Sequence, residues 1–138
     1  RQCDPGRLTM SGAYAVLAIS LGSIIGALLR YGLSVAMNAL VPPIPMGTLA
    51  SNLIAAYIVG FAIAYFGMAP GLSPVWRLFV ITGLAGGLST FSTFSAELLT
   101  LLRDGRLGWS AGMLALHVGG SLAMTVLGMA TVSLIRQP

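Results

Sequence analysis

Residues 83–95 read Gly-Leu-Ala-Gly-Gly-Leu-Ser-Thr-Phe-Ser-Thr-Phe-Ser, and they lie inside an apolar segment that runs from Val75 to Leu102. Glycines are followed there by five hydroxyl side chains, at a depth where a membrane-spanning segment meets the lipid core. Lipid offers no hydrogen-bond partners, so polar or irregular backbone persists there only when protein covers it or when it lines a watery cavity. The stretch therefore indicates an ion or permeation site inside a membrane protein.

The composition is that of an integral membrane protein. The chain of 138 residues is 57% hydrophobic and 7% charged, with a mean hydropathy of +0.93, whereas soluble domains carry about 25% charged residues. The net charge of +4 rests on arginines spread singly along the chain. Because no basic stripe with interleaved aromatic residues exists, we expect no nucleic-acid partner. The lone Cys3 cannot pair within the chain and has no metal-binding spacing.

Four apolar segments span about residues 12–37, 47–68, 75–102 and 109–135. Each reaches the roughly 20 residues that a membrane helix needs. The breaks between them, at 41–45, 69–74 and 103–106, contain proline, glycine or charged residues. We therefore predict an all-α integral membrane protein, with one four-span membrane domain over 12–136 that follows a polar N-terminal leader at 1–11. The small residues Gly22, Ser23, Gly26 and Ala27 predict a helix-packing face on the first span.

The third segment is longer than a straight spanning helix requires, and tilt could absorb the excess. The glycines at 83, 86 and 87 favour instead two half-helices joined by a non-helical break around residues 86–89. Broken helices direct carbonyl groups and helix ends at ions near the bilayer centre in several transporters.

Arginine placement bears on orientation in the membrane. With four spans, Arg77 and Arg136 share a face with both chain ends, and Arg30, Arg103 and Arg106 lie on the other face. The arginine and lysine bias of short loops sets orientation, and this chain has almost none even when Arg1 and Arg7 of the leader are counted. We therefore expect insertion in both orientations and antiparallel dimers, the alternative being that a single marginal arginine decides.

Residues for catalysis are scarce. Of the acidic residues Asp4, Glu97 and Asp104, only Glu97 lies inside a span, and the one histidine has no orienting partner within reach by sequence. We predict that the chain is not an enzyme.

Polar residues inside the spans instead form a track. His117, Ser121 and Thr125 recur at helical spacing and share one face of the fourth span. The track also includes Asn52 of the second span and, on one side of the third span, Thr90, Thr93 and Glu97. Phe91 and Phe94 share an adjacent side of the third span. Each has a structural alternative, because intramembrane hydroxyls often bond back to their helix, phenylalanines pack and amides join helices.

The two charged residues within or near the end of a span are Arg30 and Glu97. Arg30 either reaches the interface or pairs with backbone carbonyls. Glu97 is protonated, hydrogen-bonded or at a water-filled mouth, and it could couple proton movement.

The run Gly86 to Ser95 closely resembles the signature of the Fluc (CrcB-type) fluoride channels, with Ser89 where threonine is usual. Gly26-Ala27-Leu28-Leu29-Arg30-Tyr31 resembles the first-span motif of that family. Gly47-Thr48-Leu49, with Asn52 and Gly60, resembles the second-span motif, although Ala55 and Ala56 depart from the Gly-Ser often found there. The resemblance covers nearly all of residues 12–135.

The resemblance implies a fluoride-selective channel of a bacterial inner membrane, which exports cytoplasmic fluoride passively through two pores of an antiparallel, dual-topology homodimer. It implies pore roles for Phe91, Phe94, Asn52, Ser92, Thr93, His117, Ser121 and Thr125. It also implies a structural Na⁺ at the dimer centre, held by the backbone carbonyls of Gly86 and Ser89. Arg30 and Glu97 are expected to be supporting polar residues.

The sequence leaves two alternatives to a fluoride channel. A small four-span multidrug exporter driven by proton exchange would need a carboxylate in the first span, where this chain has none. A membrane assembly subunit, whose glycines only pack helices, leaves Asn52 and the hydroxyl run without a role.

Overall fold

The computed structural model describes residues 5–41 and 44–136, and every regular element within them is helical. Four helical stretches are long and apolar enough to cross a membrane: Gly12–Met37, Met46–Met68, Pro74–Arg103 and Leu107–Ile135. They match the predicted spans closely. Helix α1 is Pro5–Met37, so the backbone of residues 5–11 continues the first helix, while Cys3 lies outside the described residues.

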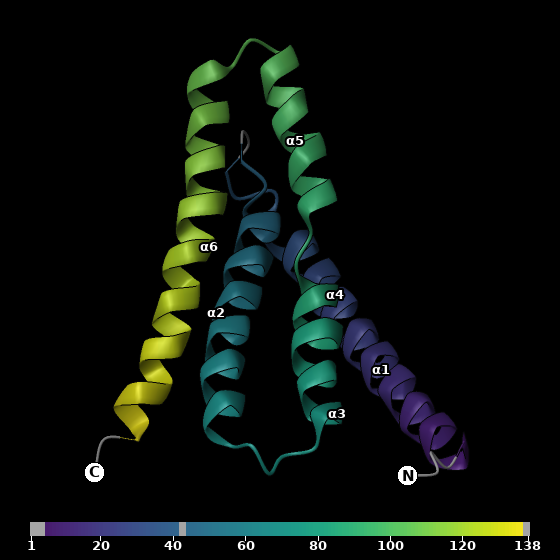
Figure 1. The fold of residues 1–138 in the computed structure, drawn as a ribbon. Coiled ribbons are helices and arrows are strands. Elements are labelled where there is room, and N and C mark those ends of the chain that lie inside the picture. The colour runs from purple at the N-terminus through teal and green to yellow at the C-terminus, as the bar shows by residue number, and fades with distance from the viewer. Residues whose placement is uncertain (1–4, 42–43, 137–138) are drawn as a thin grey trace.

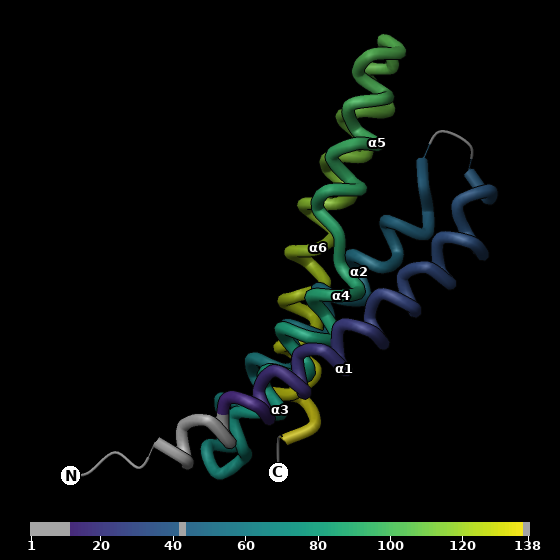
Figure 2. The backbone as a smooth tube through the Cα atoms, turned by 90° about the vertical axis from the view of Figure 1, so that its right-hand side faces the viewer, coloured from purple at the N-terminus to yellow at the C-terminus, as the bar shows by residue number. Residues whose placement is uncertain are grey.

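The helices form two closely packed pairs (Figures 1 and 2). Helix α2 (Met46–Met68) lies along α6 (Leu107–Ile135), and α1 crosses the first half of the third span. That span consists of α3 (Pro74–Arg77), the π-helical stretch η1 (Leu78–Ala85), α4 (Gly86–Leu88) and α5 (Phe91–Arg103). Beyond α4, α5 leaves α1 and runs beside α6 as a long hairpin. The start of α1, the α2–α3 turn and the end of α6 lie at the same end of the molecule, as four spans require.

Local sequence explains where the helices begin and end. Ser73 caps α3 by accepting a hydrogen bond from the Val75 amide, with Pro74 at the first helical position. At the α5–α6 turn Gly105 has a φ of +70°, which glycine adopts without steric cost. The Arg106 amide donates to the Leu101 carbonyl oxygen at 2.9 Å, which is the 6→1 hydrogen bond of a Schellman motif at a helix C-terminus.

Glycines bring α1 into backbone contact with the third span. A Cβ atom on Gly26 would lie 2.7 Å from the Leu88 nitrogen, and one on Gly87 would lie 2.6 Å from the Ser23 carbonyl oxygen. Gly22 and Gly83 meet in the same way, one turn away. The predicted packing face on the first span is confirmed at Gly22, Ser23 and Gly26. Small residues that let helix backbones approach are the usual basis of such contacts in membranes.

A second close crossing joins α2 to α6. Cβ atoms on Gly60 or Gly128 would collide with backbone of the facing helix. Hydrogen bonds add to the contact, because the Tyr57 hydroxyl donates to Thr131 Oγ1 at 3.1 Å and Thr125 Oγ1 donates to the Ala56 carbonyl oxygen at 3.3 Å. Large apolar side chains such as Leu17 and Leu134 cover the outside of the helices. This outward apolar surface is what a protein solvated by lipid presents.

The glycine contact predicts a sharp difference between two positions of α1. Gly26→Ala places a methyl group against backbone that cannot move aside, so we expect a loss of about 1–3 kcal/mol of stability, as for other overpacked sites. Gly32→Ala on the same helix meets nothing within 4 Å, so it is the matched control and should be neutral or slightly stabilising. Thermal unfolding in detergent, followed by circular dichroism, measures both. Equal behaviour of the two variants would contradict the contact.

Candidate functional site

The third span is broken, as the sequence predicts, but the break lies two residues later than expected. Gly86 and Gly87 remain helical, and the chain becomes extended at Ser89 (φ −76°, ψ 154°) and Thr90 (φ −152°, ψ 111°). Gly87 remains helical because it packs against α1. The extended residues are Ser89 and Thr90, the first two of the hydroxyl-bearing residues. The expectation of a break around residues 86–89 is corrected to Ser89–Thr90.

Thr90 restarts the helix after the break. Its Oγ1 accepts a hydrogen bond from the Thr93 amide at 3.2 Å, which caps the N-terminus of α5. The same oxygen lies 2.9 Å from Thr93 Oγ1 and 3.3 Å from Ser92 Oγ. Ser92 and Thr93, both predicted as pore residues, thus gather around the cap.

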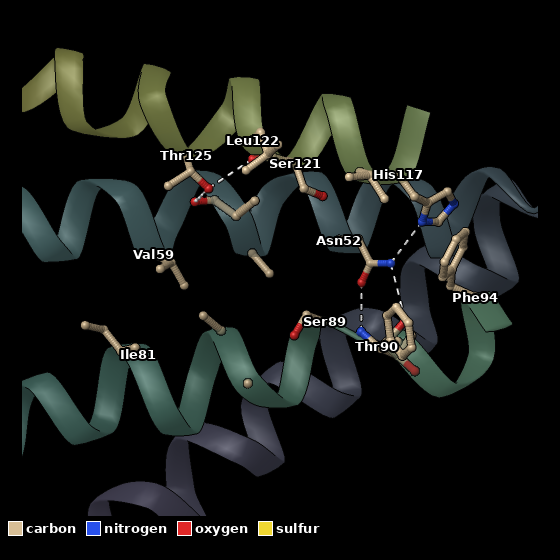
Figure 3. Close-up of a pocket in the computed structure, with 16 residues that line it drawn as sticks. Asn52, Val59, Ile81, Ser89, Thr90, Phe94, His117, Ser121, Leu122 and Thr125 are labelled. Atoms are coloured by element: carbon tan, nitrogen blue, oxygen red, sulfur yellow. Dashed lines mark hydrogen bonds between the residues drawn. The ribbon is translucent and has the colours of Figure 1, made fainter. Parts of the chain in front are cut away.

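Asn52 on α2 binds the extended backbone of Thr90 from the side (Figure 3). Its Oδ1 accepts from the Thr90 amide at 2.7 Å, and its Nδ2 donates to the Thr90 carbonyl oxygen at 3.3 Å. Nδ2 also lies 3.1 Å from Nδ1 of His117 on α6. One side chain therefore joins α2, the break and α6, and both of its amide hydrogens have protein acceptors.

The break leaves the four carbonyl groups of residues 86–89 without their helical donors, and two of them are those of Gly86 and Ser89. In a continuous helix the Thr90 and Thr93 amides would donate to the carbonyl oxygens of Gly86 and Ser89, but they bond Asn52 Oδ1 and Thr90 Oγ1 instead. Among the described residues, no recorded hydrogen bond reaches either oxygen. Between them, the Gly87 carbonyl oxygen accepts from Arg30 Nε at 3.2 Å. Arg30 therefore pairs with a carbonyl, one of its two expected roles.

A groove of about 520 Å³ runs between α2, α6 and the third span. Figure 3 shows polar side chains from these elements turned toward it. The predicted site residues that line it are Asn52, Gly86, Ser89, Phe91, Phe94, His117, Ser121 and Thr125. Ser92, Thr93, Arg30 and Glu97 do not line it. The groove thus brings together the fourth-span track, the break and the two rings.

The apolar wall of the groove was not predicted from the sequence. It consists of Ala55, Ala56, Val59, Ile81, Ala85, Val118 and Leu122. On α2 these residues follow Asn52 at helical spacing, so the face that carries the amide also carries the wall. That spacing was the available signal, but it does not distinguish a groove wall from a face that packs on another helix.

The two phenylalanines have different surroundings. Phe94 is 4% exposed and stacks on the His117 ring, with 4.5 Å between ring centroids. Phe91 is 77% exposed, and its ring centroid lies 5.7 Å from that of Phe94. An exposed aromatic side chain beside this groove is a surface that a further protein element could cover.

Glu97 belongs to a separate buried contact, one turn beyond Phe94. Thr48 Oγ1 donates to Glu97 Oε1 at 2.8 Å, and Thr48 is 1% exposed. Ser51, on the same stretch of α2, is fully buried and donates to the Thr48 carbonyl oxygen at 3.0 Å. The sequence did not predict these partners, since Thr48 stood out there only as part of the second-span motif.

These features define a multi-pass helical membrane protein with a polar site at the depth of a helix break. Within residues 5–41 and 44–136, no three His, Cys, Asp or Glu residues lie close enough to hold a metal ion. The family model described as CrcB-like protein, Camphor Resistance (CrcB), matches residues 17–129. The chain belongs to the CrcB family.

Curated relatives cover most of the chain. A protein of Xanthomonas oryzae pv. oryzae is 66% identical over 136 residues, which are 99% of this chain and 81% of the relative. A protein of Pseudomonas paraeruginosa is 61% identical over 115 residues, or 83% and 91% of the two chains. Both are named fluoride-specific ion channel FluC. Because the relatives are ion channels, the prediction that the chain is not an enzyme is confirmed.

Proposed function

We propose that the protein is a fluoride channel that lets cytoplasmic fluoride leave a bacterial cell passively across the inner membrane. The observation that carries the proposal is the groove, which places hydroxyl groups, an imidazole and two phenylalanine rings beside an extended backbone at membrane depth. Polar groups in that position line a cavity or meet protein. The bacterial relatives named as fluoride-specific channels support fluoride as the ion.

The groove has the chemistry for a small, strongly hydrated anion. Such a pore must replace water with donors, and the Ser89 and Ser121 hydroxyls line the groove with no recorded partner among the described residues. Phenylalanine rings carry a positive edge that an anion can approach. Among the described residues no arginine lines the groove, and Arg30 instead donates to the Gly87 carbonyl oxygen. Fluoride binding therefore stays weak enough for the ion to be released again, which is the condition for conduction.

The same groove supports assembly as a homodimer. In one protomer Phe91 is 77% exposed, Ser89 is exposed, and the groove is not enclosed. Lipid cannot satisfy the polar groups there, whereas a second copy can cover them and complete two pores. The near balance of arginines between the two faces supports an antiparallel, dual-topology pair.

A structural Na⁺ fits the break. The carbonyl oxygens of Gly86 and Ser89 have lost their helical donors and are free to face a cation. Unwound backbone carbonyls are the groups that hold Na⁺ in broken membrane helices. When bound, the ion would supply positive potential near the pores and join the broken helices of two protomers. Gly86 and Ser89 would act through backbone atoms, so serine in place of threonine at 89 leaves that role intact.

Passive flow suits the chemistry of the ion. Hydrogen fluoride enters a cell from acidic surroundings, dissociates and leaves fluoride inside, and an inside-negative potential then drives the anion out. A proton-coupled exporter would instead need a carboxylate in the pathway, and Glu97 lies outside the groove with Thr48 as its partner.

Fluoride efflux from liposomes that contain the purified protein, read with a fluoride electrode, tests the channel. We expect fast, proton-independent release of fluoride and little release of chloride. Phe94→Ile or Phe91→Ile should cut efflux roughly tenfold or more, equivalent to about 1.4 kcal/mol of lost stabilisation. Phe66→Ile, away from the groove, is the control. No release from folded wild-type protein would refute the channel, and unchanged release from both ring variants would refute the ring-edge contact.

Dual topology predicts that the α5–α6 turn appears on both sides of the membrane. With Cys3→Ser and Asp104→Cys, a membrane-impermeant maleimide added to intact cells should label about half of the chains, because acidic residues contribute little to orientation. Permeabilised cells give the total. Labelling of nearly all or nearly none of the intact-cell sample would contradict insertion in both orientations.

Bound Na⁺ predicts a cation-dependent stability. Replacement of Na⁺ by N-methyl-D-glucamine during purification should lower the thermal midpoint of unfolding, and restored Na⁺ should reverse the change. At a concentration about 100 times the dissociation constant the ion adds about 2.7 kcal/mol. Choline at equal ionic strength is the control. A midpoint that does not respond to Na⁺ would contradict the site.

A further inference from the structure

The Thr90 amide decides how the side chain of Asn52 is oriented. A backbone N–H only donates, so the atom that faces it at 2.7 Å is the carbonyl oxygen Oδ1. The amino group Nδ2 must then face the Thr90 carbonyl oxygen, at 3.3 Å, and His117 Nδ1, at 3.1 Å. The contact with Thr90 agrees with this orientation, because a carbonyl oxygen only accepts.

The orientation of Asn52 in turn decides the tautomer of His117. An amide NH₂ group donates and does not accept, so Nδ1 of the imidazole must offer its lone pair. In a neutral imidazole the single proton then resides on Nε2. The Thr90 amide thus fixes the orientation of the Asn52 side chain, and Asn52 in turn fixes the tautomer of His117.

The Nε2–H group that results has no protein partner. His117 is 4% exposed, and Nε2 is one of the buried side-chain atoms without a hydrogen bond among the described residues. A buried donor without an acceptor is costly, and the few found in native structures call for an explanation. The ring lies between Asn52 and Phe94, at the end of the groove (Figure 3).

We propose that Asn52 is a positioning residue that locks His117 as the Nε2–H tautomer and so keeps an unpaired N–H donor available to the anion. This inference rests on the proposed function for the identity of the anion, but the tautomer follows from the contacts alone. Since both amide hydrogens of Asn52 are already bonded, Asn52 acts on the ion through His117 and the Thr90 backbone rather than as a donor itself.

The other tautomer would work against conduction. It would place a proton on Nδ1 against the NH₂ group of Asn52, so two donors would face each other. It would also present the lone pair of Nε2, which repels an anion. Asn52 therefore selects one neutral tautomer of His117. Without this contact, the imidazole would exchange between its two neutral forms.

The chain contains one histidine, so histidine labelled with ¹⁵N gives the signals of a single imidazole once a non-histidine purification tag is used. In lipid bilayers at neutral pH we expect Nδ1 unprotonated and Nε2 protonated, with the Nε2–H signal shifted by sodium fluoride and not by sodium chloride. A protonated Nδ1 in the wild-type protein would overturn the tautomer, and an Nε2–H signal that ignores fluoride would overturn its contact with the anion.

Asn52→Asp tests the lock, because a carboxylate of the same shape accepts but cannot donate to Nδ1. We expect the proton to move to Nδ1 and fluoride efflux to fall roughly tenfold or more. The matched control is Asn38→Asp, since Asn38 uses its Oδ1 to accept from the Gly47 amide at 2.9 Å and keeps an acceptor as aspartate. His117→Gln places an N–H donor near the Nε2 position and should retain more efflux than His117→Leu.

The outcomes separate the two claims. If Nδ1 stays unprotonated in Asn52→Asp, the lock is refuted whatever the efflux, and the wild-type spectrum decides the tautomer even if that variant fails to fold. Wild-type protein that shows the Nε2–H tautomer but releases no fluoride would refute the proposed function and leave the assignment of Asn52 intact.

Discussion

The structure depends on the hydrogen bonds that Asn52 makes to the backbone of Thr90. Inside a bilayer an unsatisfied amide or carbonyl costs several kcal/mol, as a rough measure, and a break in a spanning helix creates several at once. Asn52 pairs with the amide and the carbonyl of the most extended residue in the break. The Thr90 hydroxyl supplies the first acceptor of the next helix, so the chain can stop and restart its helix at membrane depth.

The remaining elements hold this contact in place. Gly22, Gly26, Gly83 and Gly87 bring α1 against the first half of the third span, which fixes where the break lies. Arg30, on the same face of α1, takes the Gly87 carbonyl. On the other side, the Gly60 and Gly128 crossings press α2 against α6, so His117 comes within reach of Asn52. Two glycine contacts thus position one amide between three helices.

The site differs from a simple track of hydroxyl groups. Thr125 donates to carbonyl oxygens of α2 and α6, and Thr90, Thr93 and Ser92 bond one another around the cap. Along the groove, the groups that have no recorded partner among the described residues are the Ser89 and Ser121 hydroxyls, His117 Nε2 and the carbonyl oxygens of Gly86 and Ser89. Much of the polar sequence therefore builds the scaffold, and a smaller set of atoms is left for ions.

The four spans, the membrane class, the family and the presence of a break can all be predicted from the sequence, because hydrophobic length, loop punctuation and the Gly-Gly-Leu-Ser-Thr-Phe run are local properties. It also indicated most residues of the groove through helical spacing. The folded structure was needed to place the break at Ser89–Thr90 and to show three contacts: Arg30 with a carbonyl, Thr48 with Glu97, and Asn52 with both Thr90 and His117. These contacts join residues 38 to 65 positions apart. Such pairings depend on how helices cross, and helix crossings are set by packing between distant segments rather than by the local pattern that forms each helix.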